Sequence, residues 1–164
     1  MQFSAEQYYR AGVERMEQAW RIYRYGTAYA LAMYCGGLAV ECLLRAFRWT
    51  QDPSFAGRHD LSELLKSSRL LRFDEEYLRR RGASDQRILD FALEIKGSMN
   101  EVITLWHNNL RFASEERLKT FLIGIQRHKG VKGDPLKKNA LNLLEAAQTV
   151  INRGTVLWKS EKKS

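Results

Sequence analysis

Apolar residues recur every three to four positions along most of the chain, a spacing that predicts helices rather than strands. The first helix is expected to begin at Ser4, which forms a capping-box pattern with Gln7, and to end near Tyr25, because Gly26 follows. A second helical pattern begins at Thr27, and its apolar positions extend from one face onto the flank. We therefore expect this second helix to be the central and most buried one.

The rest of the chain alternates shorter helical patterns with loop signals. Residues 50–60 are predicted to form a loop, and Asp60 with Glu63 forms the next capping box. Residues 97–113 are expected to be largely irregular, because glycine, serine and asparagine are frequent there. The helices expected after residue 60 are 61–68, a short piece that ends at Gly82, 84 to about 96, 114 to about 128, and a last helix with Asp134 and Pro135 at its start.

Alternating patterns typical of strands are nearly absent, and no internal repeat of 20 to 50 residues is found. The expected fold class is therefore all-α, as a four- to five-helix up-and-down bundle. A chain of 164 residues is long enough to bury one core. We predict one domain over residues 1–157 and a flexible basic tail over 158–164.

The composition narrows the possible environments. No segment has the ~18 uncharged apolar residues of a membrane span, and charged residues are scattered through positions 1–20, so no membrane association and a cytoplasmic location are expected. Cys35 and Cys42 lie about two helical turns apart, roughly 10 Å, and cannot form a disulfide with each other. With two cysteines and three histidines, no metal site is expected, and no motif indicates a cofactor.

The net charge of +8 favours polyanionic partners such as RNA, DNA or nucleotides. Basic runs occur at 79–81, near 130 and at Lys137 and Lys138. Such runs usually form solvated faces, and they would contact phosphates together only if the fold brings them to one side.

The stretch CGGLAVECLLRAF, residues 35–47, places Glu41 and Arg45 in the most apolar part of the second helix. The two residues are four apart with the acid first, which is the favourable order for an ion pair on one face. Neither charge can be buried alone without a large desolvation cost. One interpretation is a structural ion pair at the edge of the bundle, and the other is a pair that lines a functional groove or a dimer interface.

Three stretches together resemble the HEPN superfamily of helical bundles. They are GLAVECLLRAF, RHDLSELL and LWHNNLRFAS, and the resemblance covers roughly residues 4–128. It implies a single HEPN-like domain, a homodimer, and a module associated with nucleic acid or nucleotides in a prokaryotic defence or toxin–antitoxin type system. A protein partner encoded nearby is also implied.

The chain departs from the active ribonucleases of that superfamily, which carry an arginine and a histidine with four to six residues between them. None of His59, His107 and His128 has an arginine at that spacing, so the chain resembles the branch without the nuclease motif. His107 and Arg111 stand in the reverse order, four residues apart. If the segment were helical they would meet near one phosphate, which leaves open a divergent, metal-independent ribonuclease.

A binding hypothesis groups Arg45, His59 and Arg111 as a basic recess for phosphate, which the superfamily's association with nucleotides supports. The alternative for the third stretch is that its apolar residues seal the core while Arg111 contacts carbonyl groups or Glu41. Those apolar residues are Trp106, Leu110 and Phe112. A further hypothesis is a non-catalytic structural protein whose apolar helical face contacts a partner.

Overall fold

The computed structural model describes residues 3–54 and 59–161. Within those ranges every regular element is a helix, which confirms the all-α prediction. The elements are α1 (Ala5–Tyr25), α2 (Tyr29–Gln51), α3 (Leu61–Ser68), α4 (Leu70–Arg80), α5 (Asp85–Leu105), the 3₁₀ helix η1 (Asn108–Phe112), α6 (Glu115–Gly124) and α7 (Pro135–Glu161).

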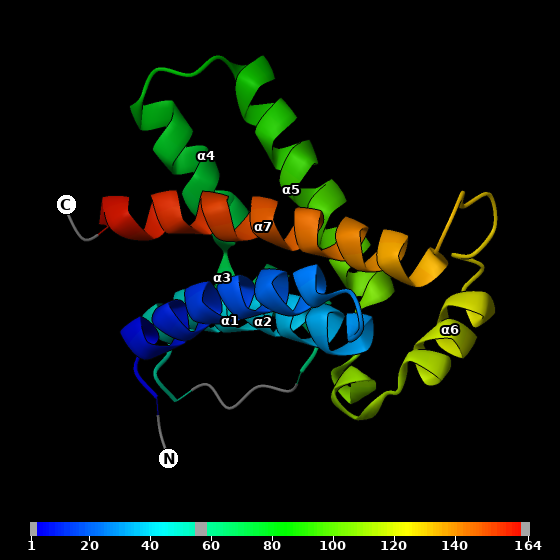
Figure 1. The fold of residues 1–164 in the computed structure, drawn as a ribbon. Coiled ribbons are helices and arrows are strands. Elements are labelled where there is room, and N and C mark those ends of the chain that lie inside the picture. Colours follow the sequence, from blue (N-terminus) through cyan, green and yellow to red (C-terminus); the bar gives the residue numbers. More distant parts are fainter. Residues whose placement is uncertain (1–2, 55–58, 162–164) are drawn as a thin grey trace.

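The four longest helices are α1, α2, α5 and α7, with 21, 23, 21 and 27 residues. Figure 1 shows α1 and α2 side by side, and α7 lies between this pair and the pair formed by α4 and α5. The short helix α3 packs against α2, and α6 lies near the start of α7. The predicted helical bundle is therefore present, with three short α-helices and one 3₁₀ helix added to four long helices among the described residues.

The predicted helix starts are confirmed by their capping hydrogen bonds. The Ser4 hydroxyl accepts from the Gln7 amide at 3.2 Å, and the Gln7 side chain accepts from the Ser4 amide at 2.8 Å. Gly26 ends α1 with φ +74, a conformation that glycine adopts without strain. The same type of cap, a side-chain oxygen that accepts from an amide three residues on, begins three further helices, at Asp60, Ser84 and Ser114.

Helix α2 is the most buried helix, as its pattern predicts. By length and composition it is the one described helix apolar enough to cross a membrane, with a mean hydropathy of 1.5 over its most apolar window. However, 72% of that window is buried inside the protein. Its apolar surface is therefore covered by α1, α3 and α7, as expected for the core helix of a globular domain.

Glycines let α2 approach its neighbours closely. A Cβ atom on Gly12 of α1 would lie 3.0 Å from the Ala39 carbonyl oxygen, and one on Gly154 of α7 would lie 2.4 Å from a methyl carbon of Leu43. A side chain at either position would force its neighbour to shift, so glycine permits the close approach. The absence of a Cβ atom at Gly12 and Gly154 thus lets α1 and α7 pack closely against α2.

Helix α5 is longer than the sequence pattern suggested. The prediction that it ends near residue 96 is wrong, since the helix continues to Leu105 through Gly97. Ile95, Met99 and Val102 are all buried, so the apolar period persists across the polar residues. Packing of this face outweighs the low helix propensity of the glycine and its neighbours, which point to solvent or to the edge of the core.

The last two helices also end away from their predicted limits. Helix α6 stops at Gly124 rather than near His128, because Gln126 adopts φ +60 and the following amide closes a turn onto Leu122. Residues 158–161, assigned above to a flexible tail, instead continue α7.

Trp158 explains this extension of α7. Its indole is 6% exposed, stacks on Tyr9 with the ring centroids 5.1 Å apart, and meets the edge of Phe47. Its Nε1 donates to Glu6 at 3.2 Å. A buried tryptophan with a satisfied N–H holds the chain in the helix, so the domain includes residue 161, while 162–164 lie outside the described residues.

Both cysteines are free thiols, as their spacing predicts. Burial raises the pKa of Cys35, and burial together with the neighbouring Glu41 carboxylate raises the pKa of Cys42 to about 11. Because the thiolate is the reactive form, neither cysteine is prepared for nucleophilic chemistry at neutral pH.

Candidate functional site

Glu41 and Arg45 form the predicted ion pair within α2. The Arg45 Nε donates to Glu41 Oε1 at 2.7 Å, and the two side chains are 12% and 3% exposed. A carboxylate this deeply buried requires several hydrogen bonds to remain charged. The pair therefore lies at the wall of the core rather than on a solvated face.

His59 completes this group from outside the helix. Its Nδ1 lies 2.8 Å and 2.9 Å from the two carboxylate oxygens of Glu41. Because a carboxylate only accepts hydrogen bonds, Nδ1 must carry the proton in this contact. The Nδ1 edge of the imidazole contacts the buried Glu41 carboxylate. The rest of the ring is accessible to solvent, since the side chain is 51% exposed.

The backbone places His59 by capping the next helix. Asp60, which follows it, accepts from the Glu63 amide at 3.0 Å and begins α3. Leu61 and Leu64 are buried, which fixes α3 against α2 and holds the preceding histidine over Glu41. The position of His59 is therefore set by helix capping and packing.

His107 approaches from the other side, after the end of α5. Trp106 is the C-cap residue of α5 and is 7% exposed, and its Nε1 donates a hydrogen bond to the Tyr34 carbonyl at 3.1 Å. The buried indole therefore fixes the position of His107, the next residue. The Nδ1 of His107 accepts from the Asn109 amide at 3.1 Å, so in the neutral ring the proton sits on Nε2.

The two histidines line one recess of about 220 Å³. Its other walls come from Asp60 and the first turn of α3, and from Trp106 and Asn108 after α5. The Asn108 side-chain oxygen is buried and has no hydrogen-bond partner among the described residues. The Nε2–H of His107 and the amide end of a helix can donate to an anion here, and His59, whose Nδ1 proton is directed to Glu41, can donate from Nε2 only as the imidazolium.

Arg111 does not join this recess, which corrects the predicted grouping with Arg45 and His59. Its guanidinium lies 4.6 Å from the ring centroid of Phe112, and it is not among the residues that line the recess. The reason is that Arg111 lies in the 3₁₀ helix η1 and not in an α-helix. With about 3.0 residues per turn, Arg111 points in a different direction from His107, four residues earlier, which lines the recess.

The same geometry separates His107 from Arg111, the two residues of the hypothetical ribonuclease. It also bears on the alternative in which the apolar residues of this stretch seal the core. His107 faces the recess, whereas Arg111 is exposed beside Phe112. Trp106 and Leu110 are buried, as that alternative expects, but Phe112 is 77% exposed and seals nothing. Arg45 shares the Glu41 carboxylate with His59 and is not a lining residue of the recess.

Sequence reasoning missed two relations at this site. The contact between Glu41 and His59 joins residues 18 apart, and the only local signal was a histidine directly before a helix cap. The shared recess of His59 and His107 arises because Trp106 packs against α2, beside Gly37. The adjacent glycines at 36 and 37, within a helix, were the signal for that close approach.

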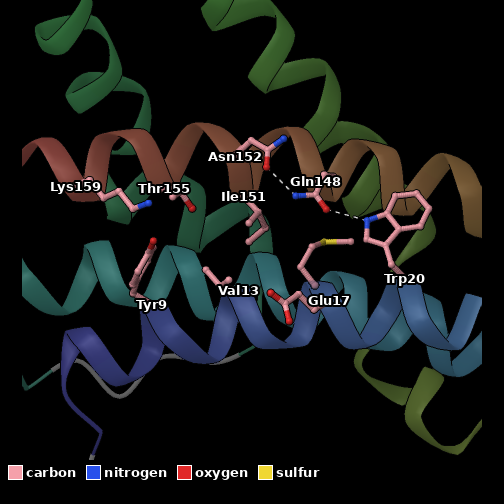
Figure 2. Close-up of a pocket in the computed structure, with 10 residues that line it drawn as sticks. Tyr9, Val13, Glu17, Trp20, Gln148, Ile151, Asn152, Thr155 and Lys159 are labelled. Carbon is pink, nitrogen blue, oxygen red and sulfur yellow. Dashed lines mark hydrogen bonds between the residues drawn. The ribbon is translucent and has the colours of Figure 1, made fainter.

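A second cavity lies in the seam between α1 and α7, shown in Figure 2, with a volume of about 360 Å³. Tyr9, Val13 and Trp20 face Ile151 and Gln148 across it. The Trp20 Nε1 donates to Gln148 Oε1 at 2.8 Å, so its polar atom already has a partner. Glu17 and Lys159 also line this cavity, but it holds neither a histidine nor a buried polar side chain without a partner among the described residues, and it is a weaker candidate than the histidine recess.

Among the residues that the structure describes, no three histidine, cysteine or acidic side chains lie close enough to hold a metal ion. Comparison of the chain with models of protein families, with curated proteins and with solved structures finds no match.

Proposed function

We propose that the protein is a HEPN-like module that binds phosphate groups of RNA or of a nucleotide in the recess between His59 and His107. The observation that carries the proposal is the meeting of these two imidazoles in one recess, with His59 held by the buried Glu41. A prokaryotic defence or toxin–antitoxin type system, a cytoplasmic location, a homodimer and a partner encoded nearby belong to the same proposal and rest on the resemblance alone.

The donors of the recess suit phosphate oxygens. The neutral His107 carries its proton on Nε2, because Nδ1 accepts from Asn109. The first amides of α3, at Leu61 and Ser62, belong to the helix turn that has no intrahelical acceptors, and both residues line the recess. The Asp60 carboxylate also lines the recess and repels an anion, so it lowers the affinity of the recess for phosphate.

The charge of the whole chain supports the same class of ligand. Lysine and arginine number 27 against 19 acidic residues, which produces a net charge of +8. A positive field concentrates polyanions near the surface and speeds their association. Binding of this kind weakens as salt rises, because counterions are released from the phosphates.

The first test measures binding of a labelled single-stranded RNA by fluorescence anisotropy. A single-stranded ligand that engages about three phosphates should lose roughly twentyfold in affinity between about 50 and 200 mM salt. His107→Asn keeps an acceptor for the Asn109 amide but removes the imidazole donor. His59→Gln keeps a donor to Glu41 but removes the Nε2–H with which the His59 imidazolium would contact the phosphate. Each variant should weaken binding by about tenfold, the loss of one hydrogen bond to a charged group.

His128 provides the matched control, since it is the third histidine and lies between α6 and α7, outside the recess. His128→Ala should bind RNA as the unchanged protein does. Equal affinity in all three variants, or an affinity that does not respond to salt, would contradict the proposal and favour a protein partner.

The geometry favours binding over the metal-independent ribonuclease. A general base needs a free lone pair and a general acid needs a transferable proton near neutral pH. The Nδ1 of His107 is occupied by the Asn109 amide, which leaves a neutral Nε2–H that is a good donor but a poor acid, and Arg111 faces Phe112 instead. We therefore expect labelled RNA to remain intact when incubated with the protein and a metal chelator, as read on a denaturing gel. Cleavage that disappears in His107→Asn would establish the nuclease instead.

A further inference from the structure

Three arginines and two aromatic rings alternate at the junction of α4, α5 and α7. The guanidinium carbon of Arg81 lies 5.6 Å from the Tyr77 ring centroid, and that of Arg153 lies 5.4 Å from the same ring. Arg153 also lies 4.5 Å from the Phe91 ring, whose other neighbour, Arg87, is at 5.8 Å. Each ring thus holds two cations, and the order is arginine, tyrosine, arginine, phenylalanine, arginine.

The fold brings these residues together from distant parts of the chain. Tyr77 lies in the last turns of α4 and Arg81 caps the end of that helix. Arg87 and Phe91 stand four apart on α5, and Arg153 comes from α7. All five line one pocket of about 370 Å³. Figure 1 shows α4 and α5 as a hairpin beside α7. The pocket lies between these helices near the turn of the hairpin, since Gly82 and Ala83 of the turn line it together with Arg153 of α7.

The charges in this pocket are poorly balanced. The neighbouring Arg79 and Arg80 have carboxylate partners, in Glu75, Asp85 and Glu161. In contrast, the contacts of Arg81 and Arg87 among the described residues are with rings alone. Guanidinium groups on aromatic faces are held in place but keep their hydrogen-bond donors.

Arg153 has one carboxylate partner and one unused donor. Its Nε donates to Asp74, and both side chains are largely buried, at 14% and 4% exposed. Burial raises the pKa of Asp74, and the Arg153 charge opposes this shift. The Arg153 Nη2 is buried and has no hydrogen-bond partner among the described residues. A buried donor without an acceptor is costly, and an acceptor supplied by a ligand would relieve that cost.

We propose that this arginine pocket, defined by Tyr77, Arg81, Arg87, Phe91 and Arg153, binds a di- or triphosphate group. Three guanidinium forks match the several oxygens of a phosphate chain, and two to four negative charges offset their mutual repulsion. The rings have guanidinium groups over their faces, so they position cations rather than stack on a base. Recognition is therefore of the phosphate chain, and the base of a nucleotide contributes little.

This pocket is separate from the histidine recess, because the two share no lining residue. The inference therefore goes beyond the proposed function and fails or holds on its own. The basic run at residues 79–81 was expected to form a solvated face. In the structure Arg79 and Arg80 form surface ion pairs, and Arg81 lines the arginine pocket.

The test is isothermal titration of the full chain with inorganic tripolyphosphate, ATP, GTP and AMP at fixed salt. Tripolyphosphate, ATP and GTP should bind within about threefold of one another, and AMP at least about tenfold more weakly, since it carries a single phosphate. Arg87→Ala should lower the affinity for tripolyphosphate at least about tenfold, and Arg87→Lys should lower it less, because lysine keeps the charge without the planar fork.

Arg80→Ala is the matched control, since Arg80 neighbours the pocket but pairs with Glu161. It should leave tripolyphosphate binding unchanged. Arg87 is exposed, so its variants retain the fold, which unfolding in urea verifies. The proposal is overturned if tripolyphosphate does not bind, if Arg80→Ala weakens binding as much as Arg87→Ala, or if only His107→Asn abolishes it. The last result would assign the phosphate chain to the recess and leave the proposed function standing.

Discussion

Replacement of Glu41 by alanine is expected to lower the free energy of unfolding by about 3–5 kcal/mol, the cost of removing one member of a buried charge pair. The carboxylate is 3% exposed and accepts from both Arg45 and His59. Its loss deprives two polar groups of a shared acceptor in a place that water reaches poorly. The change is measured as a lower midpoint of urea unfolding at an unchanged slope. Binding of RNA should weaken as well, because His59 loses its anchor.

The pair of Arg72 and Glu76 on α4 is the matched control. It has the same spacing of four residues and a distance of 2.8 Å between Nε and Oε1, but its side chains are 68% and 48% exposed. Glu76→Ala should therefore change the free energy of unfolding by no more than about 1 kcal/mol. If Glu41→Ala costs as little as Glu76→Ala, burial adds nothing to the pair, and the argument for His59 as a held side chain is lost.

Gly37→Ala should destabilise the protein by about 3 kcal/mol or more, at the upper end of what overpacking causes. A Cβ atom at this position would lie 2.0 Å from Cδ1 of the Trp106 ring and 2.3 Å from its Nε1. The indole cannot turn away without giving up its hydrogen bond to the Tyr34 carbonyl. Urea unfolding measures the loss, and near-ultraviolet circular dichroism reports the displaced tryptophan.

Gly97→Ala is the opposite case in a helix of similar length. Nothing lies within 4 Å of a Cβ atom built there, and the residue is in the interior of α5. Alanine should stabilise the protein by about 0.5–1 kcal/mol, because it has the higher helix propensity. A Gly37→Ala variant as stable as the unchanged protein would show that Trp106 does not pack against α2, and it would remove the support for the position of His107.

The helices were predictable where a local signal was sufficient. Ser4, Asp60, Ser84 and Ser114 cap helices as expected, since a cap depends on residues three positions apart. The end of α5 was not predictable from Gly97 and its neighbours, because contacts with α2 and α7 override weak local propensity.

The candidate site divides in the same way. The ion pair of Glu41 and Arg45 followed from their spacing on one helix. Its extension to His59 did not, because that contact depends on how α3 packs against α2. The expected partnership of His107 and Arg111 assumed α-helical spacing, and the 3₁₀ conformation of residues 108–112 directs the two side chains apart.

By itself, the sequence determined the all-α class, the starts of the helices, the identity of the central helix and the pairing of the two charges within it. These depend on interactions between residues within about one helical turn, which the order of amino acids specifies directly. Only the tertiary structure decided that His59 and His107 share a recess and that Arg81, Arg87 and Arg153 alternate with two rings. Those groupings join helices far apart in the chain, and they depend on close packing that no single stretch of sequence encodes.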